Sequence, residues 1–163
     1  MRLRLAQGLV VLLGLGMGLA APAQTAKESR TPTQASDSEV KTAKFSDADA
    51  ARVLDRFRQA LESYNQRGLL KLFDAGKMPD YPAFRDQVQQ FFDKYEAFQV
   101  QYRITQVSDE EHVGVALADF QVEATPNEEA SPNVRRQVQL RLVLAWEEKK
   151  WKIVDLAPRG LFN

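Results

Sequence analysis

The apolar residues of this chain change their spacing once, and that change limits the folds open to it. From residue 50 to residue 95, large apolar side chains recur every three or four positions, whereas from residue 98 to residue 156 most recur at every second position. A helix buries one face at the first spacing and a strand buries one face at the second. The order therefore predicts helices followed by strands, which is the pattern of an α+β domain.

Three helices are expected in the first group. The longest begins after Ser46, whose hydroxyl can cap it together with Asp49 three residues on, and it ends at residues 65–68. A short helix is expected at residues 69–73 and a third at about residues 81–95.

Four strands joined by hairpin connections are expected to follow. They are predicted at residues 98–105, 113–122, 136–146 and 151–156, with a bulge in the second strand near Asp119. Long strands twist, so the sheet should curl around the first helix. The predicted fold class is α+β, with N-terminal helices packed on one face of a curved antiparallel sheet of about four strands.

Residues 1–23 are predicted to be a cleavable secretory signal peptide. Arg2 and Arg4 give a basic start, an apolar run extends from residue 5 to residue 21, and Ala21-Pro22-Ala23 places small residues at the first and third positions before a cut. Cleavage there would leave Gln24 as the first residue. The product is then expected in the periplasm or outside the cell.

The alternative for this segment is an uncleaved membrane anchor, because a 17-residue apolar run is at the short end of what spans a bilayer. Four glycines in the run favour cleavage, since each weakens a helix by roughly 0.8–1.0 kcal/mol relative to alanine. Residues 24–44 contain Val40 as their only large aliphatic side chain and are predicted to be a disordered leader. The folded domain is expected at residues 45–163, with no stable membrane anchor after cleavage.

Composition excludes several kinds of site. The chain contains no cysteine, so it has no disulfide, no thiolate metal ligand and no cysteine nucleophile. His112 is the only histidine, which leaves no histidine cluster for zinc. The glycines form no phosphate-binding loop. We therefore expect neither a metal nor a cofactor.

The charge balance gives no reason to bind nucleic acid. Arg2 and Arg4 are two of the 22 basic residues and lie in the predicted signal peptide, which has no acidic residue. The remaining 20 basic residues face 22 acidic ones, so the formal charge after cleavage is −2. Binding to a phosphate backbone needs excess positive charge.

The order of these elements resembles the nuclear transport factor 2-like superfamily, which includes polyketide cyclases and ketosteroid isomerases. The resemblance covers about residues 45–162. It is carried by the long first helix, the short helix ending Leu70-Lys71-Leu72-Phe73-Asp74, and the closing segment VQLRLVLAWEEKKWKIVDLAPRGLF. The chain is similar to small exported bacterial members. The resemblance implies a cone-shaped, cystatin-like fold that isomerases, cyclases and dehydratases share with non-catalytic binding domains, so fold does not select function.

In the catalytic members an interior acid transfers a proton, which makes Asp119 and Asp155 the candidate acids here. Asp119 interrupts an apolar strand and could point into the cone, where desolvation would raise its pKa. Asp155 is expected to share a strand face with Trp151 and Ile153. The alternatives are that Asp119 faces solvent at a bulge and that Asp155 caps a turn or pairs with a lysine.

Aromatic residues supply the remaining candidates. Tyr64 is a catalytic candidate beside the two aspartates, and Tyr81 and Tyr102 are candidate ligand contacts, because a phenol can donate a hydrogen bond to a substrate carbonyl. Trp146 and Trp151 flank the last hairpin and could stack on a ligand. The alternative for all five is packing in the core or at its mouth.

Two functions of different classes are consistent with these residues. The first is a non-catalytic module that binds a small apolar ligand or a protein. The second is a cofactor-free isomerase, cyclase or dehydratase that uses Asp119 or Asp155 with a tyrosine. A cavity in which an aspartate and a tyrosine converge would favour the enzyme, and a cone filled by aromatic rings would favour the binding module. The inward side chains are expected to be Phe57, Leu61, Phe84, Val88, Phe91, Val100, Leu140 and Leu142.

Self-association through the sheet is a further expectation, since sheet faces in this superfamily often pair. Val143, Ala145 and Val154 add apolar surface to the face opposite the core, whereas the outer face of the first strand is polar. The sequence leaves a homodimer and a monomer both open.

Overall fold

The computed structural model describes residues 44–110, 113–128 and 130–163. The predicted signal peptide, the predicted leader up to residue 43, and His112 lie outside the described residues. No helix within the described ranges is long and apolar enough to cross a membrane.

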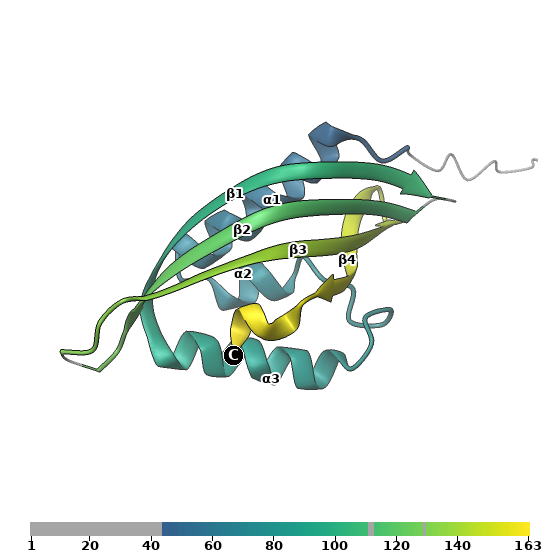
Figure 1. Cartoon of the computed structure of the whole chain (residues 1–163). Coiled ribbons are helices and arrows are strands. Elements are labelled where there is room, and N and C mark those ends of the chain that lie inside the picture. Colours follow the sequence, from purple (N-terminus) through teal and green to yellow (C-terminus); the bar gives the residue numbers. More distant parts are fainter. Residues whose placement is uncertain (1–43, 111–112, 129) are drawn as a thin grey trace, which may run out of the picture. The chain divides into compact units, whose positions relative to one another are not determined.

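The first helix, α1, spans Asp47–Glu62 and begins where the sequence predicts (Figure 1). The Ser46 hydroxyl accepts a hydrogen bond from the Asp49 backbone N–H, and the Asp49 carboxylate accepts one from the Ser46 backbone N–H. This reciprocal capping box satisfies donors that would otherwise lack partners at the start of a helix. The buried residues of α1 are Ala50, Val53, Leu54, Phe57, Ala60 and Leu61.

The second helix, α2, starts earlier than predicted. It spans Gln66–Leu70, so it begins inside the segment expected to separate two helices and ends before the predicted end at residue 73. Asn65 is its N-cap, and the Asn65 side-chain oxygen accepts from the Gly68 N–H at 2.7 Å. Cap chemistry therefore sets the start, rather than the apolar period. The third helix, α3, spans Tyr81–Lys94, close to the prediction.

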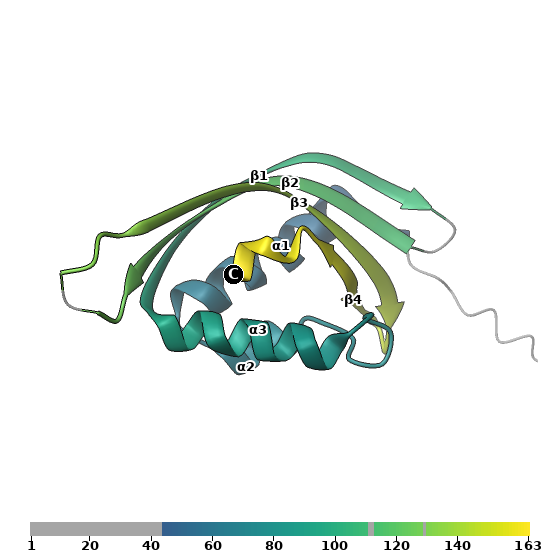
Figure 2. The same ribbon diagram turned by 60° about the horizontal axis from the view of Figure 1, so that its bottom comes forward.

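The four strands form one antiparallel sheet in the order β1-β2-β3-β4. They span Tyr95–Glu110, Val113–Pro126, Val134–Glu147 and Lys150–Ala157, and a short 3₁₀-helix, η1, follows at Arg159–Phe162. Figures 1 and 2 show the sheet arching over the helices, which lie on its concave side. The predicted α+β class and the curved four-stranded antiparallel sheet are confirmed.

Irregular pairing occurs on the two edge strands and not at the predicted position. β2 pairs with both neighbours through Asp119 without a register shift, so the bulge predicted there is wrong. β1 has a shift between Ile104 and Gln106, and β4 carries an extra residue, Val154, opposite β3. An extra residue changes the side to which the following side chains point.

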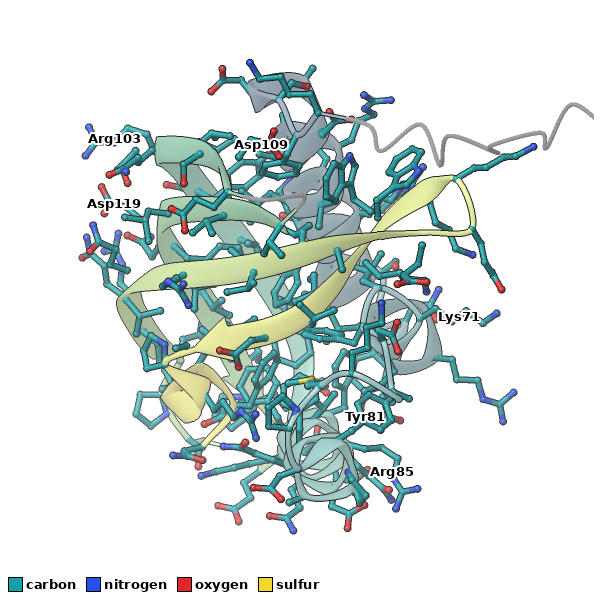
Figure 3. All side chains as sticks on the ribbon, turned by 90° about the vertical axis from the view of Figure 1, so that its right-hand side faces the viewer. Lys71, Tyr81, Arg85, Arg103, Asp109 and Asp119 are labelled. Atoms are coloured by element: carbon teal, nitrogen blue, oxygen red, sulfur yellow. The ribbon has the colours of Figure 1, made fainter. Side chains whose placement is uncertain are left out.

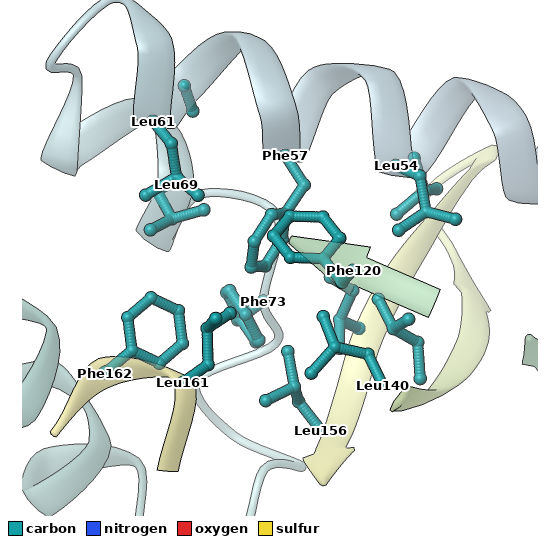
Figure 4. Close-up of a cluster of buried hydrophobic side chains, with 14 of the residues drawn as sticks. Leu54, Phe57, Leu61, Leu69, Phe73, Phe120, Leu140, Leu156, Leu161 and Phe162 are labelled. Carbon is teal, nitrogen blue, oxygen red and sulfur yellow. The ribbon is translucent and has the colours of Figure 1, made fainter. Parts of the chain in front are cut away.

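The core lies between the sheet and the helices (Figure 4). At its centre the Phe57 ring lies with its centroid 5.4 Å from that of Phe120, 6.3 Å from that of Phe73 and 6.2 Å from that of Phe162. η1 contributes Leu161 as well as Phe162, and both are buried. The whole predicted inward set is buried: Phe57, Leu61, Phe84, Val88, Phe91, Val100, Leu140 and Leu142.

Candidate functional site

No carboxylate, amine, imidazole or amide side chain is buried in the described part of the chain. The phenol of Tyr95 is buried, and its oxygen accepts a hydrogen bond from Arg136 at 3.1 Å. The hollow that includes Asp119, about 240 Å³, opens at the surface of the sheet among polar side chains. The described ranges also contain no group of three or more metal-ligating side chains. The geometry that the enzyme hypothesis needs, an aspartate and a tyrosine converging inside the cone, is not found among these residues.

Asp119 lies on the outer face of the sheet. Its neighbours Ala118 and Phe120 are fully buried, so the alternation of the strand turns Asp119 toward solvent. Its carboxylate pairs with the Arg103 guanidinium at 2.7 Å, and its side chain is 36% exposed. Figure 3 shows the two side chains together on the face turned away from the helices. Of the two orientations that the sequence allows for Asp119, the structure therefore shows the one that faces solvent.

Asp155 also points away from the core. Ile153 before it and Leu156 after it are both buried, because the extra residue Val154 interrupts the alternation of β4. The Asp155 carboxylate lies 3.9 Å from the Arg159 guanidinium, and its side chain is 40% exposed. Asp155 and Ile153 were expected to share a strand face, and this expectation is wrong.

Tyr64 and Tyr81 both lie on the helical side of the domain, where Tyr64 is exposed at the end of α1 and Tyr81 is half-buried. The Tyr64 hydroxyl donates to the backbone oxygen of Phe92, and its ring centroid lies 5.2 Å from that of Phe92 and 6.1 Å from that of Phe98. Tyr81 is half-buried at the start of α3, with its ring centroid 6.4 Å from that of Phe84. The Tyr64 contacts join the end of α1 to α3 and to the start of β1, whereas the Tyr81 contact lies within α3.

Tyr102, on β1, donates its phenolic proton to the Asp55 carboxylate of α1 at 2.8 Å. Burial, followed by the hydrogen bond and the charge of Asp55, raises the pKa of Tyr102 to about 12. The positive charge of Arg58, which lies 3.3 Å from Asp55, lowers this pKa by a smaller amount. In this structure the phenolic proton of Tyr102 is therefore directed at Asp55.

Trp146 and Trp151 face each other across the β3–β4 hairpin, with ring centroids 5.3 Å apart. Phe45, the residue before the N-cap of α1, packs against Trp151 with ring centroids 4.7 Å apart and an interplanar angle of 69°. Phe45 and Trp151 are buried, and Trp146 is half-buried. We call these three residues together with Gly114 the Phe45–tryptophan cluster. The structure thus brings both predicted tryptophans together with a third ring.

Gly114 of β2 lies directly against Phe45. A Cβ atom at this position would be 2.3 Å from Cγ of Phe45, far inside van der Waals contact, so only glycine accommodates the ring. The Phe45 backbone N–H donates to Oδ1 of Asp109, which is paired in register with Gly114. Figure 3 labels Asp109 near the start of α1. Burial of one phenylalanine contributes about 1.5–3 kcal/mol, which holds the start of α1 against the sheet.

The indole N–H of Trp151 is buried and has no hydrogen-bond acceptor among the residues that the structure describes. Buried tryptophan N–H groups usually have a partner. A buried donor without one costs about 1–3 kcal/mol. The cluster, rather than the two aspartates, therefore contains a polar group with unused binding capacity.

The family of the domain follows from a comparison with known families. A family model described as the SnoaL-like domain matches residues 43–156, well over half of the chain. The chain belongs to the SnoaL-like domain family. This result agrees with the superfamily resemblance of the short helix and the closing strands. No curated protein matches the sequence significantly.

Solved structures of low sequence identity share the fold of this SnoaL-like domain. A candidate scytalone dehydratase from Novosphingobium aromaticivorans has a TM-score of 0.58 at 12% identity, covering 67% of this chain and 79% of that one. A nuclear transport factor 2-like superfamily protein from Salmonella enterica has a TM-score of 0.58 at 10% identity, covering 67% and 86%. The intermembrane space region of the chloroplast protein ARC6 has a TM-score of 0.55 at 12% identity, covering 71% and 97%. At such identities the likeness shows the fold alone.

Sequence reasoning did not assign a site role in this SnoaL-like domain to Phe45, Gly114 or Asp55. Gly114 carries a usable signal, since an isolated glycine in a strand often marks a close approach of another group. Phe45 carries one as well, because an apolar residue before an N-cap often packs back onto the fold. Asp55 carries none, since a carboxylate on an exposed helix face is ordinary.

Proposed function

We propose that this SnoaL-like domain is a non-catalytic binding module that acts outside the cytoplasmic membrane and recognises a small apolar ligand or a protein. The observation that carries the proposal is the interior, which the described residues fill with apolar side chains. Proton-transfer catalysis needs an acid or base within hydrogen-bond reach of the reacting group. The rings around Phe57 occupy the space in which a substrate would have to lie.

The positions of the polar candidates support the same proposal. Asp119 and Asp155 each face an arginine at the surface. Exposed ion pairs of this kind are common and contribute little to stability. A domain with a filled interior binds through its surface or through a cluster at one end, and the two tryptophans offer the ring surfaces that binding sites often use.

A second candidate function is a cofactor-free isomerase, cyclase or dehydratase. The likeness to the candidate scytalone dehydratase favours it. It would use Asp119 or Asp155 as the acid or base, with Tyr64 as a donor. Under this candidate Asp119→Asn should abolish turnover of any substrate found, whereas under the binding proposal the same substitution leaves ligand binding unchanged.

Native mass spectrometry of the full chain after mild release tests the binding proposal. We expect a bound small molecule or a co-purifying protein that is recovered chemically unchanged after incubation with the chain. Trp146→Ala should lower its occupancy, while Arg103→Ala, on the exposed outer face, should not. Conversion of the bound compound into a product would contradict the proposal and support the enzyme.

Export is part of the proposal and rests on the basic start, the apolar run and the small residues before Gln24. N-terminal sequencing of the protein recovered outside the cytoplasm should begin at Gln24. A retained Met1 would contradict cleavage and favour the membrane anchor.

We also propose that the domain pairs with a second copy through the outer face of its sheet. Val143, Ala145 and Val154 are half-exposed there, and Val115 lies beside Val143 in register. Light scattering should give the mass of a dimer, and Val143→Glu should reduce it to that of a monomer. A monomer mass for the unsubstituted chain would contradict pairing. The balanced charge gives no reason to expect nucleic acid as a partner.

A further inference from the structure

The Phe45–tryptophan cluster holds a donor that nothing in the described part of the chain uses, the indole N–H of Trp151. Trp151 is 8% exposed, so water has little access to it. Buried polar groups in folded proteins are nearly always hydrogen-bonded. The donor therefore needs an acceptor that the described residues do not supply.

Phe45 is the ring that a ligand could replace. It contacts Trp151 through its ring, and its backbone N–H makes a long hydrogen bond of 3.3 Å to Asp109. The capping box of α1 begins one residue later and does not include the Phe45 side chain. The ring can therefore leave the cluster without unwinding the helix.

We propose that the space filled by the Phe45 ring is a ligand-binding site, which opens when the ring moves away from Gly114 and takes a small, neutral, apolar molecule with one hydrogen-bond acceptor, such as a ketone. The acceptor oxygen binds the indole N–H of Trp151. The apolar part occupies the position of the Phe45 ring. This inference rests on the proposed binding function and specifies its site and ligand class.

The surroundings select a neutral ligand. The rings of Trp146 and Trp151 offer apolar surface on which the ligand can pack. The Asp109 carboxylate, which accepts the hydrogen bond from the Phe45 backbone N–H, would repel an anion. An ammonium group cannot accept a hydrogen bond from the indole. A ketone or ether oxygen can accept one, and it carries no net charge.

Phe45 competes with the ligand, so the affinity depends on how often its ring leaves the site. The apparent dissociation constant equals the intrinsic one divided by the open fraction. Burial of a phenylalanine ring favours the closed state by roughly 30-fold, so Phe45→Ala, which removes the competing ring, should tighten binding by about that factor. Gly114→Ala should instead weaken binding, because the added Cβ lies where both the ring and the apolar part of the ligand would have to sit.

The indole signals in a proton–nitrogen correlation spectrum of the full chain provide the test. The chain has two tryptophans, and Trp146→Phe assigns the remaining signal to Trp151. Titration with cyclohexanone should move the Trp151 indole proton downfield as the hydrogen bond forms. The midpoint should be roughly 30-fold lower in Phe45→Ala than in the unsubstituted chain. Methylcyclohexane, which has a similar shape but no acceptor, should give no downfield shift.

Phe162→Ala is the matched control, because Phe162 is as buried as Phe45 but contacts Phe57, Phe84 and Phe91 instead. It should leave the cyclohexanone midpoint unchanged. A folded Phe45→Ala chain whose Trp151 signal does not respond would overturn the inference, and so would equal midpoints with and without the ring. If Phe45→Ala does not fold, Phe45→Val, which keeps a smaller apolar side chain in the core, is titrated in its place and judged by the same two criteria.

The test of this binding site and the test of the proposed function can give different results. A ligand found by native mass spectrometry, together with a silent Trp151 signal, would remove this site and leave the binding module standing. Catalytic turnover, together with a responsive Trp151 signal, would remove the non-catalytic proposal and leave the site.

Discussion

Phe45 and Gly114 restrict each other, because a Cβ atom on Gly114 would lie 2.3 Å from Cγ of the Phe45 ring. The contact joins the residue before the cap of α1 to the second residue of β2. Glycine normally weakens a strand interior. Here its missing side chain is replaced by the ring of Phe45, which also closes the end of the core beside Trp151.

Gly114→Ala should destabilise the domain by about 1–3 kcal/mol, since the new methyl group overpacks against a buried ring. Urea denaturation monitored by tryptophan fluorescence measures this change, because both tryptophans belong to the cluster. In a Phe45→Ala background the same substitution should cost less than about 0.5 kcal/mol, because the two sites couple through one contact. Equal costs in both backgrounds would show that the ring does not press on Gly114.

The Tyr102–Asp55 contact predicts a loss of stability at high pH. The folded pKa of Tyr102, about 12, lies above its ordinary value of 10.0, because burial and the Asp55 carboxylate disfavour the phenolate. Its contribution is therefore fully present below pH 10 and is lost as the pH rises through 12. The phenolate absorbance of the chain should contain a step near pH 12.

Two substitutions test that assignment. Tyr102→Phe should remove the step near pH 12, and Asp55→Asn should move it toward 10, since the amide carries no charge to oppose the phenolate. A step that persists in Tyr102→Phe would assign it to another tyrosine.

Asp119→Asn should change the free energy of unfolding by less than about 1 kcal/mol, because its ion pair with Arg103 is exposed to solvent. Arg103→Gln removes the other partner of the pair and should have an effect of the same size. Urea denaturation of both variants measures it. A loss above about 2 kcal/mol in either variant would mean that the pair is more important to the sheet than its exposure indicates.

Most of the fold follows from the sequence, because side-chain period and helix caps are local properties. Ser46 and Asp49 determine the start of α1, and the alternation through Leu140 and Leu142 determines the inner face of β3. The sequence prediction places the start of α2 too late, because Asn65 caps this helix instead of ending α1. The spacing of the apolar residues does not show whether Asn65 ends one helix or begins the next.

The candidate site was harder to predict because it depends on register. Asp155 would share a face with Ile153 in a regular strand, but the extra residue Val154 turns it outward. Asp119 faces outward by the regular alternation of β2 between buried Ala118 and Phe120, without the bulge that the sequence predicts there. The contact of Phe45 with Trp151 joins residues from opposite ends of the domain sequence. The spacing of apolar residues along the chain cannot predict such a long-range contact.

Arg136 gives the last prediction, because one guanidinium holds η1 in the core. It donates to the Leu161 carbonyl oxygen at 2.7 Å and to the Tyr95 hydroxyl at 3.1 Å, and it lies 5.3 Å from the Phe91 ring centroid. Lysine cannot reproduce this fork of donors. Arg136→Lys should therefore lower the free energy of unfolding by about 1.5–3 kcal/mol and speed hydrogen exchange at residues 159–162.

The neighbouring Arg135 provides a matched control for this prediction. Its side chain is exposed and bonds to Gln121 on the outer face of the sheet. Arg135→Lys should leave hydrogen exchange at residues 159–162 unchanged, because that side chain has no bond to η1. If both variants exchange equally fast, the polar contacts of Arg136 do not hold η1, and the burial of Leu161 and Phe162 alone keeps the segment in place.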